Sequence, residues 1–114
     1  MASRLLVKEK NDPYYVEKIA KDIDFVIKHT LGMTKEALEI NEVLIDSILF
    51  RFIQISENMK RLSDDFRIKH AEISWVSVIG LRNKIVHDYG DVRLDVIYQT
   101  IQMDLPKLKE VFHF

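Results

Sequence analysis

Apolar residues that recur three and four positions apart constrain the fold of this 114-residue chain more than any other feature. This spacing places side chains on one face of an α-helix. It runs through positions 12–31, 41–62 and 92–114, with a further stretch at 74–89. The three longest stripes comprise Tyr15, Ile19, Ile23, Val26 and Ile27; Leu44, Ile45, Ile48, Leu49, Phe52, Ile53, Met59 and Leu62; and Leu94, Ile97, Ile101, Leu105, Leu108 and Phe112.

No stretch alternates apolar and polar residues as a half-buried strand would, and the chain has only 3 glycines and 2 prolines. The sequence therefore predicts an all-α fold, an antiparallel up-and-down bundle of four to five helices. We expect residues 1–114 to form a single domain, with 1–11 as a flexible N-terminus.

Four residues predict where these helices begin, end or bend. Asp12 followed by Pro13 is typical of a helix start, with Asp12 as the cap. Gly32 is expected to end that helix, because glycine readily adopts a left-handed turn. Pro106 lies inside the last apolar stripe and predicts a kink there.

The composition excludes several classes of protein. With 17 basic and 18 acidic residues the net charge is −1, so any contact with a nucleic acid must depend on a local site. The absence of cysteine excludes disulfides, cysteine nucleophiles and zinc–thiolate sites, and it fits a reducing compartment. We see no signal peptide and no apolar run of the ~20 residues that a membrane span needs, so we expect a cytoplasmic protein.

Arg82 interrupts the apolar pattern of the stretch 74–89. Its nearest helical neighbours are Val78 and Ile79 on one side and Ile85 and Val86 on the other. An arginine within a stripe that should face the core needs an anionic partner or dense hydrogen bonding. This residue is therefore the first candidate for a functional role.

His87 follows Arg82 by five residues, which corresponds to about 140° around a helix and about 7.5 Å along it. Arg82 and His87 therefore do not share one face of one helix, whereas Asn83 lies one turn before His87 and could orient its imidazole. Metal-free RNA cleavage needs an acid–base group and a cation for the phosphate, which histidine and arginine supply. By spacing alone, an ion-pair network or a dimer contact is the more common explanation for such a pair.

Other polar residues keep two explanations open. Glu57 either forms a salt bridge with Arg61 or supports the candidate functional arginine, Arg82. The basic residues Arg61, Arg67 and Lys69 form either a solvated surface or a track for RNA. The remaining histidines, His29, His70 and His113, have no metal-ligand spacing, so we expect neither a metal nor a cofactor.

The stretch 79–89 resembles the signature of the HepT-like HEPN proteins, which are associated with minimal nucleotidyltransferases. That signature is Arg, Asn, three residues, His, one residue and Tyr, and here Arg82, Asn83, His87 and Tyr89 occupy those positions. The similarity extends over roughly residues 12–112. It includes Ile55-Ser56-Glu57, Leu62-Ser63-Asp64-Asp65-Phe66, His70, Ile73-Ser74-Trp75 and Gln102-Met103-Asp104-Leu105-Pro106-Lys107-Leu108.

The resemblance implies a homodimeric, metal-independent endoribonuclease, whose active site straddles the dimer interface. It implies the toxin of a type II- or type VII-like toxin–antitoxin pair, whose nucleotidyltransferase antitoxin attaches AMP to the motif tyrosine. Carried over by position, Arg82 and His87 are catalytic, Asn83 supports them and Tyr89 is the modification site. Across a twofold axis, each arginine could approach the other chain's histidine.

The chain departs from the family pattern just after the histidine. Many relatives have a glycine and a tyrosine there, followed by an aromatic residue and Gly-Val-Asp, whereas this chain has the carboxylates Asp88 and Asp91. These negative charges would oppose the close approach of a polyanion. The alternative function is a non-catalytic HEPN protein that serves as the binding or regulatory partner of a nucleotidyltransferase.

Overall fold

The computed structural model describes residues 10–86 and 93–112, without the side chains of Arg82, Ile85 and Val86. Its elements are α2 (Asp12–Thr30), α3 (Lys35–Glu39), α4 (Glu42–Lys60), α5 (Asp64–Lys69), α6 (Trp75–Ile79), α7 (Leu81–Val86), α8 (Leu94–Gln99), the π-helical turn η1 (Thr100–Asp104) and α9 (Leu105–Phe112). The part of the chain described contains no strand, which confirms the all-helical prediction. Positions 1–9 of the expected flexible N-terminus lie outside the described residues.

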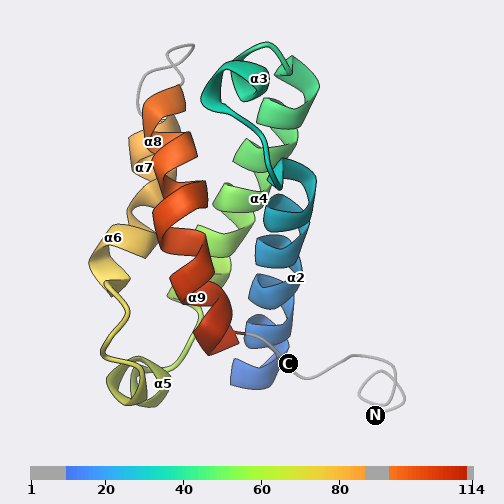
Figure 1. The fold of residues 1–114 in the computed structure, drawn as a ribbon. Helices are drawn as coiled ribbons and strands as arrows, with labels where there is room; N and C mark the ends of the chain where they lie inside the picture. Colours follow the sequence, from blue (N-terminus) through green and yellow to red (C-terminus); the bar gives the residue numbers. More distant parts are fainter. Residues whose placement is uncertain (1–9, 87–92, 113–114) are drawn as a thin grey trace.

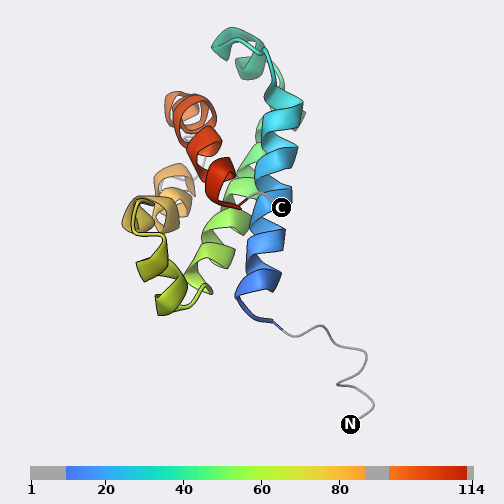
Figure 2. The same ribbon diagram turned by 60° about the horizontal axis from the view of Figure 1, so that its bottom comes forward.

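Helix α4 lies in the middle of the molecule, with α2 along one flank and α6 and α7 along the other (Figures 1 and 2). Helices α2 and α4 run in opposite directions, joined by α3 at one end of the molecule. Helix α9 packs on α2, and α8 contacts α3 and α7. Helix α5 joins α4 to α6 at the opposite end of the molecule from α3 (Figure 1).

The predicted apolar stripes supply one shared core. Ile19, Ile23 and Val26 of α2 are fully buried, as are Ile48 and Phe52 of α4. The C-terminal segments contribute further buried side chains, namely Ile97, Ile101, Leu105, Leu108 and Phe112. Burial of this apolar surface is the main favourable term that holds the helices together.

The predicted cap of the first helix is wrong by one residue. Asn11 is the N-cap, and its Oδ1 accepts the Tyr14 N–H at 3.2 Å. The Asp12 carboxylate instead accepts the N–H of Ser63 at 2.9 Å and also the Ser63 hydroxyl. Since Ser63 caps α5, this pair connects the start of α2 to the start of α5.

The other predicted helix ends occur close to their expected positions. Helix α2 ends at Thr30, and Gly32 adopts the left-handed φ of 74°.

Just before Pro106, where the sequence predicts a kink, the chain forms a π turn, in which the N–H of Leu105 donates to the carbonyl of Thr100. Because proline has no N–H and its ring crowds the preceding turn, a widened turn just before it relieves the clash.

The stretch 74–89 is not one continuous helix where the structure describes it. Helix α6 ends at Ile79, Gly80 adopts φ −78° and ψ −4°, and α7 begins at Leu81. A Cβ at Gly80 would lie 3.0 Å from the Val76 carbonyl oxygen, so the chain approaches itself closely here. The end of the predicted helix, 87–89, lies outside the described residues.

A search of the described helices finds none that is both long and apolar enough to cross a membrane.

Candidate functional site

The structure places the first half of the predicted motif on α7. The backbones of Arg82 and Asn83 belong to this helix, and the side chain of Asn83 is exposed. The side chain of Arg82 lies outside the description, as do His87 and Tyr89 entirely. How the arginine, the histidine and the tyrosine lie relative to one another therefore stays a prediction.

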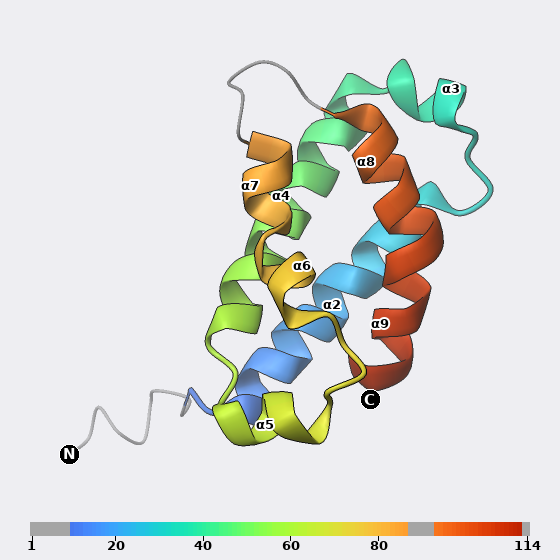
Figure 3. The ribbon, with the colours of Figure 1, turned by 90° about the vertical axis from the view of Figure 1, so that its left-hand side faces the viewer.

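Helix α7 is anchored through the residue directly before Arg82. Leu81 is only 8% exposed and belongs to the shared core, whereas Asn83 and Lys84 face solvent. The helix packs against α4 and touches α8, near the end of the molecule that also holds α3 (Figure 3). The motif thus begins on a helix with one buried side and one accessible side.

A cavity of about 410 Å³ lies beside α6 and α7, on the side facing α8, η1 and α9. Apolar side chains such as Ile55 and Leu105 line it, and both signs of charge occur along it, for example Lys84 and Asp104. This mixture matches the near-zero net charge of the whole chain. The cavity alone does not form a basic track of the kind that binds a nucleic-acid backbone.

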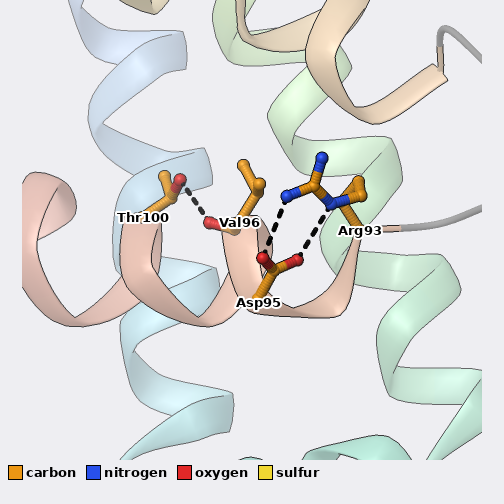
Figure 4. A network of polar contacts seen from close by, with 4 residues as sticks. All are labelled: Arg93, Asp95, Val96 and Thr100. Atoms are coloured by element: carbon orange, nitrogen blue, oxygen red, sulfur yellow. Dashed lines mark hydrogen bonds and ion pairs between the residues drawn. The ribbon is translucent and has the colours of Figure 1, made fainter.

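The start of α8 is fixed by an ion pair (Figure 4). Arg93 donates to Asp95 through Nε at 3.2 Å and through a terminal nitrogen at 3.0 Å, so that the guanidinium grips the carboxylate at both oxygens, and both side chains are exposed. The hydrogen bond from Arg93 lowers the pKa of the exposed Asp95, and the Val96 backbone N–H lowers it further. One turn on, the Thr100 hydroxyl donates to the Val96 carbonyl at 2.8 Å.

Replacing Arg93 with alanine should raise the pKa of Asp95 back toward its ordinary value of 3.8. Because pairing depresses the pKa, the pair stabilises the fold above that ordinary pKa, and this contribution is lost as the pH falls. An NMR titration of the Asp95 carboxyl carbon measures the change. Arg93→Lys, which keeps one charge without the fork, should raise the pKa less. An unchanged Asp95 pKa in Arg93→Ala would contradict the assignment.

Of the basic residues Arg61, Arg67 and Lys69, Arg67 makes contacts within the fold. Arg67 donates to the carbonyls of Met59 and Lys60, at 3.3 and 2.8 Å, and its guanidinium lies 5.8 Å from the centre of the Trp75 ring. Arg67 therefore satisfies the C-terminal end of α4, which favours a structural role over an RNA track for this residue. Glu57 lies 3.5 Å from Lys60, a partner that the sequence had not predicted.

One polar residue near the motif was not singled out by the sequence. Ser56 of α4 is fully buried, and its hydroxyl donates to the carbonyl of Val78 in α6 at 3.1 Å. In the sequence, Ser56 stands out only as part of the family-like run Ile55-Ser56-Glu57 and as a small polar residue inside an apolar helix. Its acceptor is 22 positions away and could not be inferred from the sequence.

Within the described residues, no three or more histidine, aspartate or glutamate side chains gather as they would around a metal ion. His70 Nδ1 lies 3.4 Å from Glu72, and the ring of His29 packs against Phe25 with 4.3 Å between ring centres.

Comparison with known proteins gives a consistent result. The family model described as "Ribonuclease HepT-like" matches residues 19–113. "Putative RNase TTE0752" of Caldanaerobacter subterraneus subsp. tengcongensis is 30% identical over 84% of this chain and 86% of its own. "Probable ribonuclease HepT" of Thermococcus cleftensis is 29% identical over 86% of this chain and 89% of its own.

A third relative is longer. The "Gamma-glutamylcyclotransferase and putative RNase MJ0434" of Methanocaldococcus jannaschii is 28% identical over 89% of this chain, which spans 46% of that protein. No solved structure matches the chain. The family model covers most of the sequence, including all four motif residues on and after α7, and the chain therefore belongs to the HepT-like ribonuclease family.

Proposed function

We propose that this protein is a metal-independent endoribonuclease, with Arg82 and His87 as its catalytic residues. The observation that carries the proposal is the complete motif, Arg82, Asn83, His87 and Tyr89, in a chain that matches the ribonuclease family over residues 19–113. Two relatives whose names include RNase or ribonuclease align with most of the chain, which supports RNA as the substrate.

The chemistry follows from the two side chains. His87 removes the proton of a ribose 2′-hydroxyl, whose oxygen attacks the neighbouring phosphorus, and the imidazolium formed in this way gives the proton to the departing 5′-oxygen. The bond from phosphorus to that 5′-oxygen breaks, leaving a 2′,3′-cyclic phosphate and a 5′-hydroxyl. Arg82 holds the phosphoryl oxygens, where charge accumulates in the transition state. Asn83 orients the imidazole.

We further propose that the active protein is a homodimer. Five residues along one continuous helix correspond to about 140° of rotation, so the two positions would not share a face, and a second copy would bring the arginine of one protomer to the histidine of the other. Val76 on α6 is 88% exposed, which supplies apolar surface for a partner close to the motif. The expected interface buries at least ~1,200 Å² in total, and light scattering should report a dimer at micromolar concentration.

The remaining parts of the proposal concern the cellular role of the protein and its antitoxin partner. The chain acts as one cytoplasmic domain and as the toxin of a toxin–antitoxin pair. Its antitoxin is a minimal nucleotidyltransferase, which silences the toxin by attaching AMP to Tyr89. Asp88 and Asp91, which depart from the family pattern, place two carboxylates close to Tyr89 in the sequence.

The test is cleavage of end-labelled RNA by the purified chain, with and without EDTA. We expect cleavage in both, with cyclic phosphate at the new 3′ ends, because Arg82 and His87 supply the acid–base and cationic groups themselves. Cleavage that EDTA abolishes would show a metal-dependent mechanism. An intact dimer that cleaves no RNA would favour the non-catalytic partner of a nucleotidyltransferase.

A further inference from the structure

Ser56 uses its hydroxyl differently from three other serine and threonine residues of the described structure. Thr30, Ser47 and Thr100 each donate to a carbonyl of their own helix four residues earlier, at 2.7, 3.1 and 2.8 Å. This local bond is the usual choice for serine and threonine in a helix. The hydroxyl of Ser56 instead leaves α4 and donates to α6.

The carbonyl that accepts this hydroxyl has a particular place in the chain. In an uninterrupted α-helix the carbonyl of Val78 would be the partner of the N–H four residues on, which is that of Arg82. Here the helix is interrupted at Gly80, between those two residues. The hydroxyl of Ser56 occupies the Val78 carbonyl on the N-terminal side of this break, at 3.1 Å.

The contact is fully desolvated on its serine side. Ser56 has no exposed surface, whereas α6 has no buried residue and α7 is anchored by Leu81. Trp75, Val78 and Ile79 of α6 are only partly buried where they pack against the core. A hydrogen bond from a fully buried hydroxyl to the half-buried Val78 helps to fix the position of the end of α6.

We propose that Ser56 is a positioning residue for Arg82. By holding the Val78 carbonyl, it fixes the end of α6 and the break at Gly80, and thereby sets the direction in which α7 presents the arginine. This inference rests on the proposed ribonuclease function, because it gives Ser56 a role in catalysis without contact with RNA. A guanidinium that must grip a phosphate at two points loses its effect when its helix shifts by a fraction of an ångström.

The test compares Ser56→Ala with Thr30→Val, a matched control that also removes a buried hydroxyl bonded to a carbonyl. Each variant is measured for kcat, KM, melting temperature and the hydrogen exchange of individual backbone amides. In Ser56→Ala we expect kcat to fall roughly ten- to hundredfold and KM to stay within about twofold of the wild type. The backbone amides of Leu81 and Arg82 should exchange hydrogen faster in Ser56→Ala than in the wild type. Their exchange rates should be unchanged in Thr30→Val.

Three results would overturn the proposal, and they differ from one another. A kcat of Ser56→Ala equal to that of an active wild type would refute the positioning role and leave the ribonuclease function standing. Equal losses of kcat and melting temperature in both variants would show that Ser56 only stabilises the fold. A wild type without ribonuclease activity would refute the proposed function itself, and with it the catalytic meaning of faster amide exchange.

Discussion

Replacing His87 with alanine should reduce RNA cleavage at least ~10²-fold and to background, while the helical fold is retained. The imidazole is the only group in the proposed site whose ordinary pKa lies near neutrality, so its loss removes both proton transfers. Cleavage of labelled RNA and circular dichroism measure the two effects. His29→Ala, which changes a histidine whose ring packs against Phe25 within α2, should cleave normally. Cleavage that persists in His87→Ala would refute the mechanism.

The same experiment extends to Arg82. Arg82→Ala should abolish cleavage, and Arg82→Lys should restore little, because one ammonium cannot grip two phosphoryl oxygens as a guanidinium does. A fully active Arg82→Lys would mean that only the charge matters. Both variants should keep the wild-type helical content, since Leu81, the residue directly before Arg82, anchors α7 in the shared core.

Mixing the two inactive variants tests the shared active site directly. In a heterodimer of Arg82→Ala and His87→Ala protomers, one of the two composite sites contains an intact arginine and an intact histidine. Random exchange of protomers should therefore recover about a quarter of the wild-type activity. No recovery, in a mixture shown by mass spectrometry to have exchanged, would place both residues in one protomer's site.

The long helices were predictable because their apolar residues are local signals. The stripes of Ile19, Ile23 and Val26 and of Ile48 and Phe52 repeat at the helical spacing, and all five side chains are buried. Such a repeat predicts both a helix and its inward face without knowledge of any distant contact.

The N-cap of α2 and the break at Gly80 were less predictable. They depend on competition between neighbouring capping residues or on contacts with residues distant in the sequence. Asn11 and Asp12 are both good helix caps, and the contact of Asp12 with Ser63 decided between them. A glycine inside a helical pattern is usually tolerated, so the break at Gly80 had no clear local signal. It coincides with the bond from Ser56 across to α6.

In the candidate site, too, some residues carry a local sequence signal and others depend on distant contacts. Arg82 and His87 were found first as an arginine on an apolar stripe near a histidine, which by spacing alone fitted a structural ion pair as well as catalysis. The order of Arg82, Asn83, His87 and Tyr89 made the ribonuclease motif specific. Ser56 was not predicted as a site residue, because the carbonyl that its hydroxyl contacts lies 22 positions away in the sequence.

Co-expression with the cognate nucleotidyltransferase should silence the wild-type protein and add AMP to Tyr89. Tyr89 lies two residues after His87 and seven after Arg82, so an attached phosphodiester could occupy the position meant for an RNA phosphate and pair with the arginine. The added charge and bulk would also repel an incoming strand. Intact mass should rise in steps of about 329 Da, one AMP unit each, with the change mapped to the peptide containing Tyr89.

Tyr89→Phe should keep cleaving RNA but escape silencing, because it lacks only the hydroxyl that accepts AMP. Tyr98→Phe is the matched control, since the half-buried phenol of Tyr98 donates to the Met33 carbonyl at 3.3 Å within the fold. Tyr98→Phe should remain fully sensitive to the partner. Complete neutralisation of a wild-type protein whose Tyr89 stays unmodified would mean that the partner inhibits by binding alone, and Tyr89 would lose its role as the modification site.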